Sequence, residues 1–163
     1  MDKNEIYEYF DKRNVCYEVI DHNAVYNMEE MSVLTLPNSD VIAKNLFVRD
    51  KNRHTYYLIA IKGEKRINLK DFKRNNGTGS LTFADDKDMK DILELSPGSV
   101  TPLGLLNDKE CKVRLFIDKD FMDSPSLIGV HPNENTATIW LRTEDLVRII
   151  REHGNDVSIV EIN

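Results

Sequence analysis

The sequence has few of the residues that mark fibrous, secreted or disordered chains. Its 163 residues include only 2 cysteines, 5 prolines and 7 glycines, which excludes collagen-like and proline-rich disordered chains. Cys16 and Cys111 lie far apart and form no C-x-x-C pair, so the pattern favours two reduced thiols over a disulfide framework, a redox motif or a zinc site. A chain of this length buries enough surface to fold without such cross-links.

Long apolar runs and nucleotide or metal motifs are also missing. No segment approaches the ~20 residues that a membrane-spanning helix needs, and the first ten residues, MDKNEIYEYF, are charged rather than signal-like. We therefore expect a cytoplasmic protein that does not contact membranes. No H-E-x-x-H motif, cysteine cluster or carboxylate constellation is present, and Gly77-Thr78-Gly79 lacks the third glycine and the lysine of nucleotide loops. We expect no metal and no cofactor.

An overall excess of positive charge is absent, because the net charge is -6, and this alone argues against binding to nucleic acid. The charge is nevertheless segregated along the chain. Residues 44–74 contain ten Lys or Arg against three Asp or Glu, a local charge of +7, which leaves -13 for the remainder. The pattern indicates local contact with a polyanion, and the alternative is a solvated basic face. The candidate phosphate contacts are Arg49, Lys65, Arg66 and Lys73.

Hydrophobic periodicity and turn residues predict one domain, residues 1–163, of the α+β class with a mixed sheet, because helices and strands intermingle without regular βαβ spacing. We expect helices over residues 6–13, 28–34, 69–74, 86–95 and 103–107, and a last helix that begins at a Thr143 cap and ends at His153-Gly154. We expect strands over residues 15–20, 45–49, 55–61, 80–83, 112–117, 127–130, 136–141 and 157–162.

Lys44, with Asn45 beside it, interrupts the apolar run of residues 41–48. Burying an ammonium group without a partner is costly. Lys44 therefore either lies at a strand edge with its charged end in water, or faces a phosphate or a developing oxyanion. The residues alone leave both interpretations open.

The segment SPGSVTP, residues 96–102, is the second candidate. Gly98 permits a positive φ or a close backbone approach, and Thr101 followed by Pro102 fits the start of a short helix. Unpaired N–H groups at such a position can bind a carbonyl oxygen, and the alternative is an ordinary helix start. His131, at a strand end before a Pro-Asn turn, is the third candidate, and its alternative is a structural or exposed histidine.

The order of these segments resembles that of the YbaK/ProX family of aminoacyl-tRNA editing domains. The segments that carry the resemblance are AKNLFVRD at 43–50, PGSVTPLGLLND at 97–108, GVHPN at 129–133 and NTAT at 135–138. More narrowly, the chain is similar to the freestanding relatives of the editing insertion in bacterial prolyl-tRNA synthetase, which deacylate alanyl-tRNA(Pro). The resemblance implies a single mixed α+β domain with a curved, barrel-like sheet, surrounding helices and no metal.

The resemblance also implies roles for individual residues. Lys44 corresponds to the family's essential lysine and Asn45 to its polar neighbour, while His131 corresponds to a substrate-contacting histidine. Gly98 and Pro102 are the ends of the family's G-x-x-x-P loop. We expect the loop to contact the substrate through its other residues as well, which are Ser99, Val100 and Thr101.

The implied reaction is trans-editing of mischarged tRNA(Pro), most directly Ala-tRNA(Pro), by metal-free ester hydrolysis. A synthetase pocket for proline cannot exclude the smaller alanine, because lost apolar contacts supply only ~1–3 kcal/mol of discrimination. An editing site must then accept a methyl group and reject the proline ring. Val25, Met28 and Met31 are the candidate walls, although methionines at this spacing also suit an ordinary core.

The expected partner is the acceptor 3′ end of an aminoacylated tRNA, with association with prolyl-tRNA synthetase or a translation factor, and without DNA. Two alternatives stay open from the sequence. One is a deacylase for tRNA mischarged with cysteine or serine. The other is a tRNA- or synthetase-binding module without catalysis.

Overall fold

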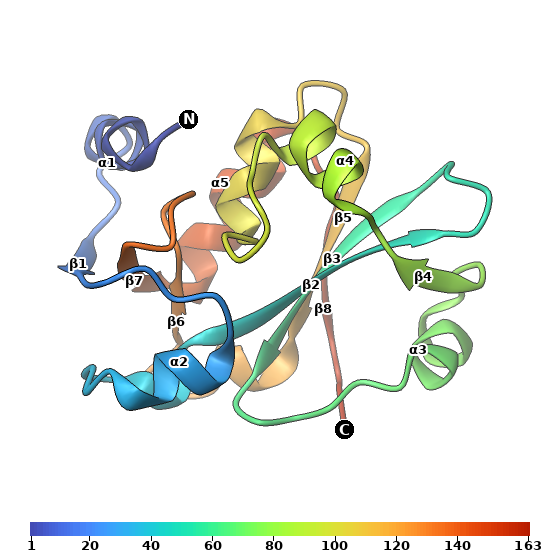
Figure 1. The fold of residues 1–163 in the computed structure, drawn as a ribbon, viewed down its shortest axis with the longest axis horizontal. Coiled ribbons are helices and arrows are strands. Elements are labelled where there is room, and N and C mark those ends of the chain that lie inside the picture. The colour runs from blue at the N-terminus through green and yellow to red at the C-terminus, as the bar shows by residue number, and fades with distance from the viewer.

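The computed structural model describes residues 1–163 as two sheets that meet edge to edge, with helices around them (Figure 1). The five-stranded sheet has the order β4-β2-β3-β5-β8 and is mixed, because β2 pairs antiparallel with β3 and β4 whereas β5 pairs parallel with β3 and β8. Its strands are β2 (Ala43–Asp50), β3 (Tyr56–Lys62), β4 (Leu81–Phe83), β5 (Val113–Asp118) and β8 (Val157–Val160). The antiparallel three-stranded sheet, in the order β1-β7-β6, consists of β1 (Tyr17–Asp21), β7 (Ala137–Arg142) and β6 (Leu127–Val130).

The two sheets join where the chain enters β2. Ile42 forms an isolated parallel bridge with Gly129 of β6. A Cβ atom at Gly129 would lie 2.9 Å from Nε1 of Trp140 and 3.1 Å from Cγ1 of Ile42, so the junction requires a residue without a side chain. Both β4 and β8 are edge strands, so the five-stranded sheet is not a closed barrel. The predicted α+β class with a mixed sheet is confirmed.

Local sequence explains most helix boundaries. Asp2 and Glu5 form a capping box at the start of α1, and Asn68 caps α3, which ends at Gly77. The helices are α1 (Lys3–Lys12), α2 (Met28–Val33), α3 (Leu69–Asn76), α4 (Asp86–Asp88) and α5 (Thr143–His153). The shorter helical segments are the 3₁₀ turns η1 (Ser39–Val41), η3 (Pro102–Asn107) and η4 (Lys119–Met122), and the π-helical turn η2 (Met89–Leu93). No helix is long and apolar enough to span a bilayer.

Two expectations about helices need correction. The predicted Thr143 cap is wrong, because Arg142 is the N-cap of α5 and the Thr143 hydroxyl donates instead to the Phe121 carbonyl at 2.8 Å. That bond ties α5 to η4. The helix expected over residues 86–95 is one turn of α-helix followed by η2, and Glu94 in the left-handed region ends it.

The hydrophobic core fixes the direction in which β2 points its side chains. Ala43 and Phe47 belong to a main cluster of 27 buried residues, which α1 completes with Ile6 and Phe10. Val48 belongs to a second cluster on the opposite face, under α3. Because side chains alternate along a strand, Asn45 lies on the main-core face and Lys44 on the other.

Candidate functional site

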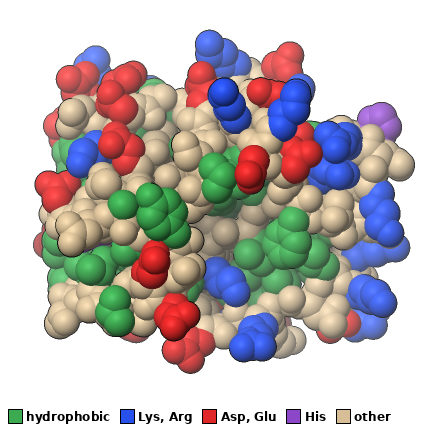
Figure 2. Space-filling model, viewed as in Figure 1, with side chains coloured by type: hydrophobic (Ala, Val, Ile, Leu, Met, Phe, Trp, Pro, Cys, Tyr) green, Lys and Arg blue, Asp and Glu red, His purple; other side chains and the backbone are tan.

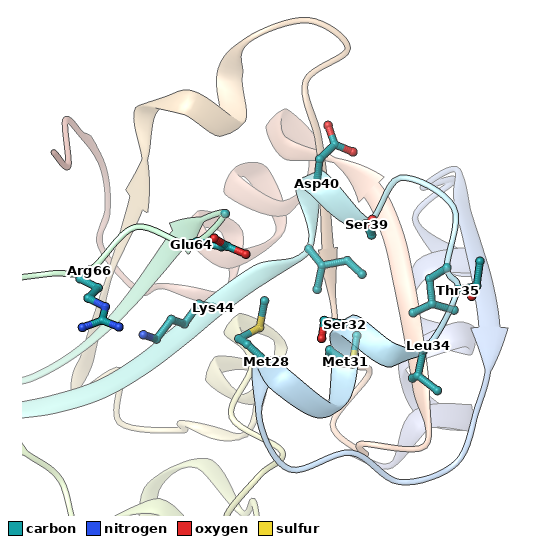
Figure 3. Close-up of a pocket in the computed structure, with 13 residues that line it drawn as sticks. Met28, Met31, Ser32, Leu34, Thr35, Ser39, Asp40, Lys44, Glu64 and Arg66 are labelled. Atoms are coloured by element: carbon teal, nitrogen blue, oxygen red, sulfur yellow. The ribbon is translucent and has the colours of Figure 1, made fainter.

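A cavity of about 780 Å³ opens beside the start of β2 (Figure 3). Its walls come from α2, the segment through η1 that leads into β2, and the loop after β3. The volume lies in the range of about 300–1,000 Å³ that is usual for small-ligand pockets, and it exceeds what an alanine side chain alone needs. The lining residues are Met28, Met31, Ser32, Leu34, Thr35, Leu36, Ser39, Asp40, Ile42, Lys44, Gly63, Glu64 and Arg66.

Lys44 is the cation that β2 places in this cavity. It is half-buried and has no carboxylate partner, and it lies opposite Ile61 in the β2–β3 pairing. Figure 3 shows Lys44 and Arg66 extending toward the same end of the cavity, with the thioether of Met28 nearby. This end therefore combines unneutralised positive charge with an apolar wall.

The Gly98 loop is held against β2 and against the end of β6 by side-chain hydrogen bonds. Asn45 Nδ2 donates to the Val100 carbonyl at 3.4 Å. The buried Thr101 hydroxyl donates to the His131 carbonyl at 2.7 Å and also accepts from the Leu103 N–H, as the N-cap of η3 with Pro102 at its first position. These bonds bring together three segments that are far apart in the sequence.

Several polar groups of this loop region have no partner within the protein. The Ser99 N–H donates to the Ser96 carbonyl at 3.0 Å, but the N–H groups of Gly98, Val100 and Thr101 have no acceptor. Asn45 Oδ1 is buried and accepts no hydrogen bond. A buried polar atom without a partner costs about 1–3 kcal/mol, so the site carries donors and an acceptor that a polar ligand can satisfy.

Gly98 connects the loop to α2. Its φ is +87°, and a Cβ atom there would lie 2.7 Å from Cδ1 of Tyr26. Tyr26 immediately precedes the N-cap residue of α2, and Met28 is the first residue of that helix. The backbone of the loop thus packs directly against the segment that places Met28 in the cavity.

His131 has a defined hydrogen-bonding state. Its Nδ1 lies 2.9 Å from the Ala137 carbonyl, which accepts, so Nδ1 carries the proton and Nε2 is the acceptor of the neutral ring. Burial lowers the pKa of His131, the nearby His22 ring lowers it further, and the bond to Ala137 opposes both. The His22 and His131 ring centroids are 6.1 Å apart.

The expected site residues fall into two adjacent groups. Lys44, Met28 and Met31 line the cavity, whereas Asn45, the Gly98 loop and His131 form the hydrogen-bonded group described above. The groups meet at β2, because Lys44 and Asn45 are consecutive, and at Tyr26. Val25 lies outside the cavity lining and packs with Met31 and Trp140 in a small buried cluster. The Thr101 side chain and Pro102 are buried and position the loop.

Sequence reasoning did not identify the carboxylates of the cavity. Asp40 and Glu64 line it, and they come from η1 and from the loop after β3. Neither lies in a motif or a periodic segment, so no sequence pattern marks them.

Two of the four candidate phosphate contacts form ion pairs within the protein. Arg49 pairs with the buried Asp88, and Lys65 pairs with Asp118 and Asp120. Desolvation alone lowers the pKa of Lys65, but hydrogen bonds to Asp120 and Asp118 outweigh it, and the net shift is upward. Arg66 and Lys73 have no such carboxylate partner and line cavities.

The fold and the site together define a small α+β domain with a cation-bearing cavity beside unpaired main-chain donors, which suits a polar, anionic ligand. No group of three or more His, Cys, Asp or Glu side chains is placed to hold a metal ion. The chain belongs to the aminoacyl-tRNA editing domain family, whose model matches residues 22–149.

Relatives that match nearly the whole chain include the prolyl-tRNA editing protein ProX of Acetoanaerobium sticklandii. It is 35% identical over 160 residues, which are 98% of this chain and 97% of the relative. The prolyl-tRNA synthetase associated domain-containing protein 1 of Bos taurus is 32% identical over 149 residues, 90% of this chain and 86% of the relative. A solved structure of a proposed trans-editing enzyme for prolyl tRNA synthetase covers 99% of this chain and 96% of its own, with a TM-score of 0.75 and 16% identity, and it shares the fold.

Substitution of Gly98 tests the contact between the loop and Tyr26. Gly98→Ala adds backbone strain of about 1–2 kcal/mol at positive φ and, through the clash with Tyr26, a further ~1–3 kcal/mol of overpacking. Gly63→Ala is the matched control, because Gly63 also has a positive φ, +70°, but no atom lies within 4 Å of the position that its Cβ would take. We expect urea unfolding to show a larger loss of unfolding free energy for Gly98→Ala than for Gly63→Ala. Adding Tyr26→Ala to the Gly98→Ala variant should restore part of that free energy. Equal losses at the two glycines would contradict the contact.

The lowered pKa of His131 predicts a pH-dependent stability. The unfolded value is about 6.5, so the contribution of the neutral ring is complete above that pH and is lost as the pH falls toward the lower folded value. We expect the free energy of unfolding to fall between about pH 6.5 and about pH 5, where most carboxyl groups stay ionised. His131→Asn retains a donor for the Ala137 carbonyl. In urea unfolding, this variant should show a smaller dependence of the unfolding free energy on pH. An unchanged slope would mean that His131 is not the group responsible.

Proposed function

We propose that this protein is a trans-editing hydrolase that deacylates mischarged tRNA(Pro), with Ala-tRNA(Pro) as its main substrate. Membership of the editing-domain family and the similarity to ProX over nearly the full length support this proposal. The observation that carries it is the position of Lys44, which forms no ion pair with the carboxylates of its cavity and adjoins Asn45, whose Oδ1 is buried, and the Gly98 loop. The acceptor 3′ end of the tRNA is the direct partner, in the cytoplasm, and the proposal includes association with prolyl-tRNA synthetase or a translation factor.

The reaction is hydrolysis of the ester that joins the amino acid to the terminal ribose. Water attacks the carbonyl carbon, the bond from that carbon to the ribose oxygen breaks, and the products are the free amino acid and the tRNA hydroxyl. The N–H groups of Gly98, Val100 and Thr101, which have no acceptor within the protein, stabilise the oxyanion. A hydroxyl of the substrate ribose carries the proton from the attacking water to the leaving oxygen.

The remaining polar groups orient the substrate. Lys44 binds the terminal phosphate or stabilises the developing negative charge. The unpaired Oδ1 of Asn45 and the Nε2 of His131 accept hydrogen bonds from the amino group of the amino acid or from the ribose. Orientation of this kind suits an ester, because the bond is intrinsically labile and positioning supplies much of the acceleration.

Selectivity for alanine is proposed to arise from the α2 wall of the cavity. Met28 and Met31 lie one helical turn apart and both line the cavity. The cavity as a whole is large enough for a nucleoside with its amino acid, so only its methionine side limits the size of the amino acid side chain. This wall accepts a methyl group and excludes the proline ring.

A panel of tRNA(Pro) charged with alanine, cysteine, serine or proline tests the substrate. We expect alanine to be released about 10- to 200-fold faster than the other amino acids, the range that a small apolar pocket supplies. Release is measured as loss of labelled amino acid from the tRNA. Faster release of cysteine or serine would identify the alternative deacylase, and release of none would leave a binding module without catalysis.

Removal of the Lys44 ammonium tests the mechanism. We expect Lys44→Ala and Lys44→Met to lower the deacylation rate by about 10²- to 10³-fold, the usual effect of losing one stabilising group of the transition state. The fold should persist, because Lys44 forms no ion pair. Lys90→Ala, at an exposed lysine outside the cavity, is the control. Near-normal turnover in both Lys44 variants would refute the assigned role.

A further inference from the structure

A second basic cavity, separate from the one that holds Lys44, lies at the opposite end of β2. This groove of about 620 Å³ is formed by α3, β4 and the turn after β2, and no Asp or Glu lines it. Figure 2 shows Lys and Arg side chains gathered along the right edge of the molecule, where Figure 1 places α3, β4 and the β2–β3 turn. The lining residues are Lys51, Leu69, Lys70, Lys73, Arg74, Thr78, Ser80 and Leu81.

Most cations in the groove are not neutralised by the protein. Arg74 pairs with Asp71, but Lys51, Lys70 and Lys73 have no carboxylate partner, and Lys73 instead donates to the Ser80 hydroxyl at 3.1 Å. Other basic residues of the same segment do form ion pairs, as Arg49 does with Asp88 and Lys65 does with Asp118. Three unpaired ammonium groups in one groove create a local positive potential within a chain whose net charge is -6.

The length of β2 sets the distance between the groove and the proposed reaction site. Lys44 lies near the start of β2, and Lys51 follows the last residue of that strand. At a rise of about 3.3 Å per residue, the seven-residue separation corresponds to about 23 Å. One strand of a duplex carries a phosphate about every 3.4 Å along the axis. A polynucleotide with its 3′ end at Lys44 therefore reaches the groove with phosphates several nucleotides before that end.

We propose that this groove binds the sugar-phosphate backbone of the tRNA acceptor stem, through Lys51, Lys70 and Lys73, while the aminoacylated 3′ end occupies the Lys44 cavity. The proposal deepens the proposed function and rests on it. Phosphate contacts of this kind supply affinity and orientation and do not read the base sequence. The hydroxyls of Thr78 and Ser80 add polar groups to the same groove.

Salt dependence measures these contacts directly. Each phosphate contact on a duplex contributes about 0.9 to the slope of log affinity against log salt, so three contacts weaken binding by about 40-fold between about 50 and about 200 mM salt. We expect the triple variant Lys51→Gln, Lys70→Gln, Lys73→Gln to lose this part of the salt dependence in binding of uncharged tRNA(Pro). The triple Lys→Arg variant at the same positions should restore it. The control removes three exposed lysines elsewhere, Lys12→Gln, Lys90→Gln and Lys109→Gln, and should keep the wild-type slope.

A truncated substrate separates the groove from the reaction site. The triple Lys→Gln variant should have a raised KM on full-length Ala-tRNA(Pro) and a normal rate on the alanyl ester of the trinucleotide CCA, which lacks the stem. If the triple Lys→Gln variant kept the wild-type salt slope, or if the control variant altered the slope equally, the proposal that this groove binds tRNA would be overturned. Equal loss on the full-length and the truncated substrate would overturn it too, because the lysines would then act at the reaction site. The wild-type protein could also hydrolyse neither substrate but bind tRNA with a salt slope that depends on the three lysines. The proposed function would then be wrong, and the proposal that the groove binds tRNA would be supported.

Discussion

The site depends on the constraint that β2 is packed on both faces. Its alternating side chains belong to two different cores, with Phe47 in the main cluster and Val48 under α3. A one-residue shift would exchange the side chains between the two faces, which would disrupt the packing of both cores and turn Asn45 and Lys44 to the wrong sides. Lys44 and Asn45 therefore have set directions, one toward the cavity and the other toward the Gly98 loop. The junction at Ile42 and Gly129 places this strand beside β6, and so brings His131 to the same region.

Ion pairs with buried carboxylates determine which basic side chains are neutralised within the protein and which are not. Asp118 is fully buried and Asp88 nearly so, and each holds a cation that the sequence places in the same basic segment as the free ones. Removing one member of a buried pair typically costs about 3–5 kcal/mol, so the bond from Lys65 to the buried Asp118 fixes the loop that also carries Glu64 and Arg66. The pairing positions one wall of the cavity. It also leaves the unneutralised charge in two places, the Lys44 cavity and the groove beside α3.

Local patterns predicted most of the elements and marked the three segments of the candidate site, because each of these has a local cause. Thr101 and Pro102 begin η3 as their residue types require, and Gly98 has the positive φ that its position indicated. What the sequence did not show depends on tertiary contacts. The Thr143 hydroxyl bonds to a distant carbonyl instead of capping its helix, and Val25 and Met31 differ in cavity exposure although their spacing suggests one wall. Glu64 and Asp40 reach the cavity from irregular segments.

The unpaired polar atoms near β2 are best explained as the cost of a site that is complete only with its ligand. Folding leaves the buried Asn45 Oδ1 without a donor, although nearly all buried polar groups are paired in folded proteins. It also leaves three loop amides without acceptors within the protein. A ligand that supplies an ammonium or hydroxyl donor and a carbonyl oxygen satisfies both kinds of group at once. An α-aminoacyl ester of a ribose contains all three within one small fragment. Thr101 and Gly98 fix the amides before any ligand binds, so in the proposed reaction their orientation would cost little free energy. Hydrogen bonds that strengthen as an oxyanion forms would then favour the transition state over the bound ester.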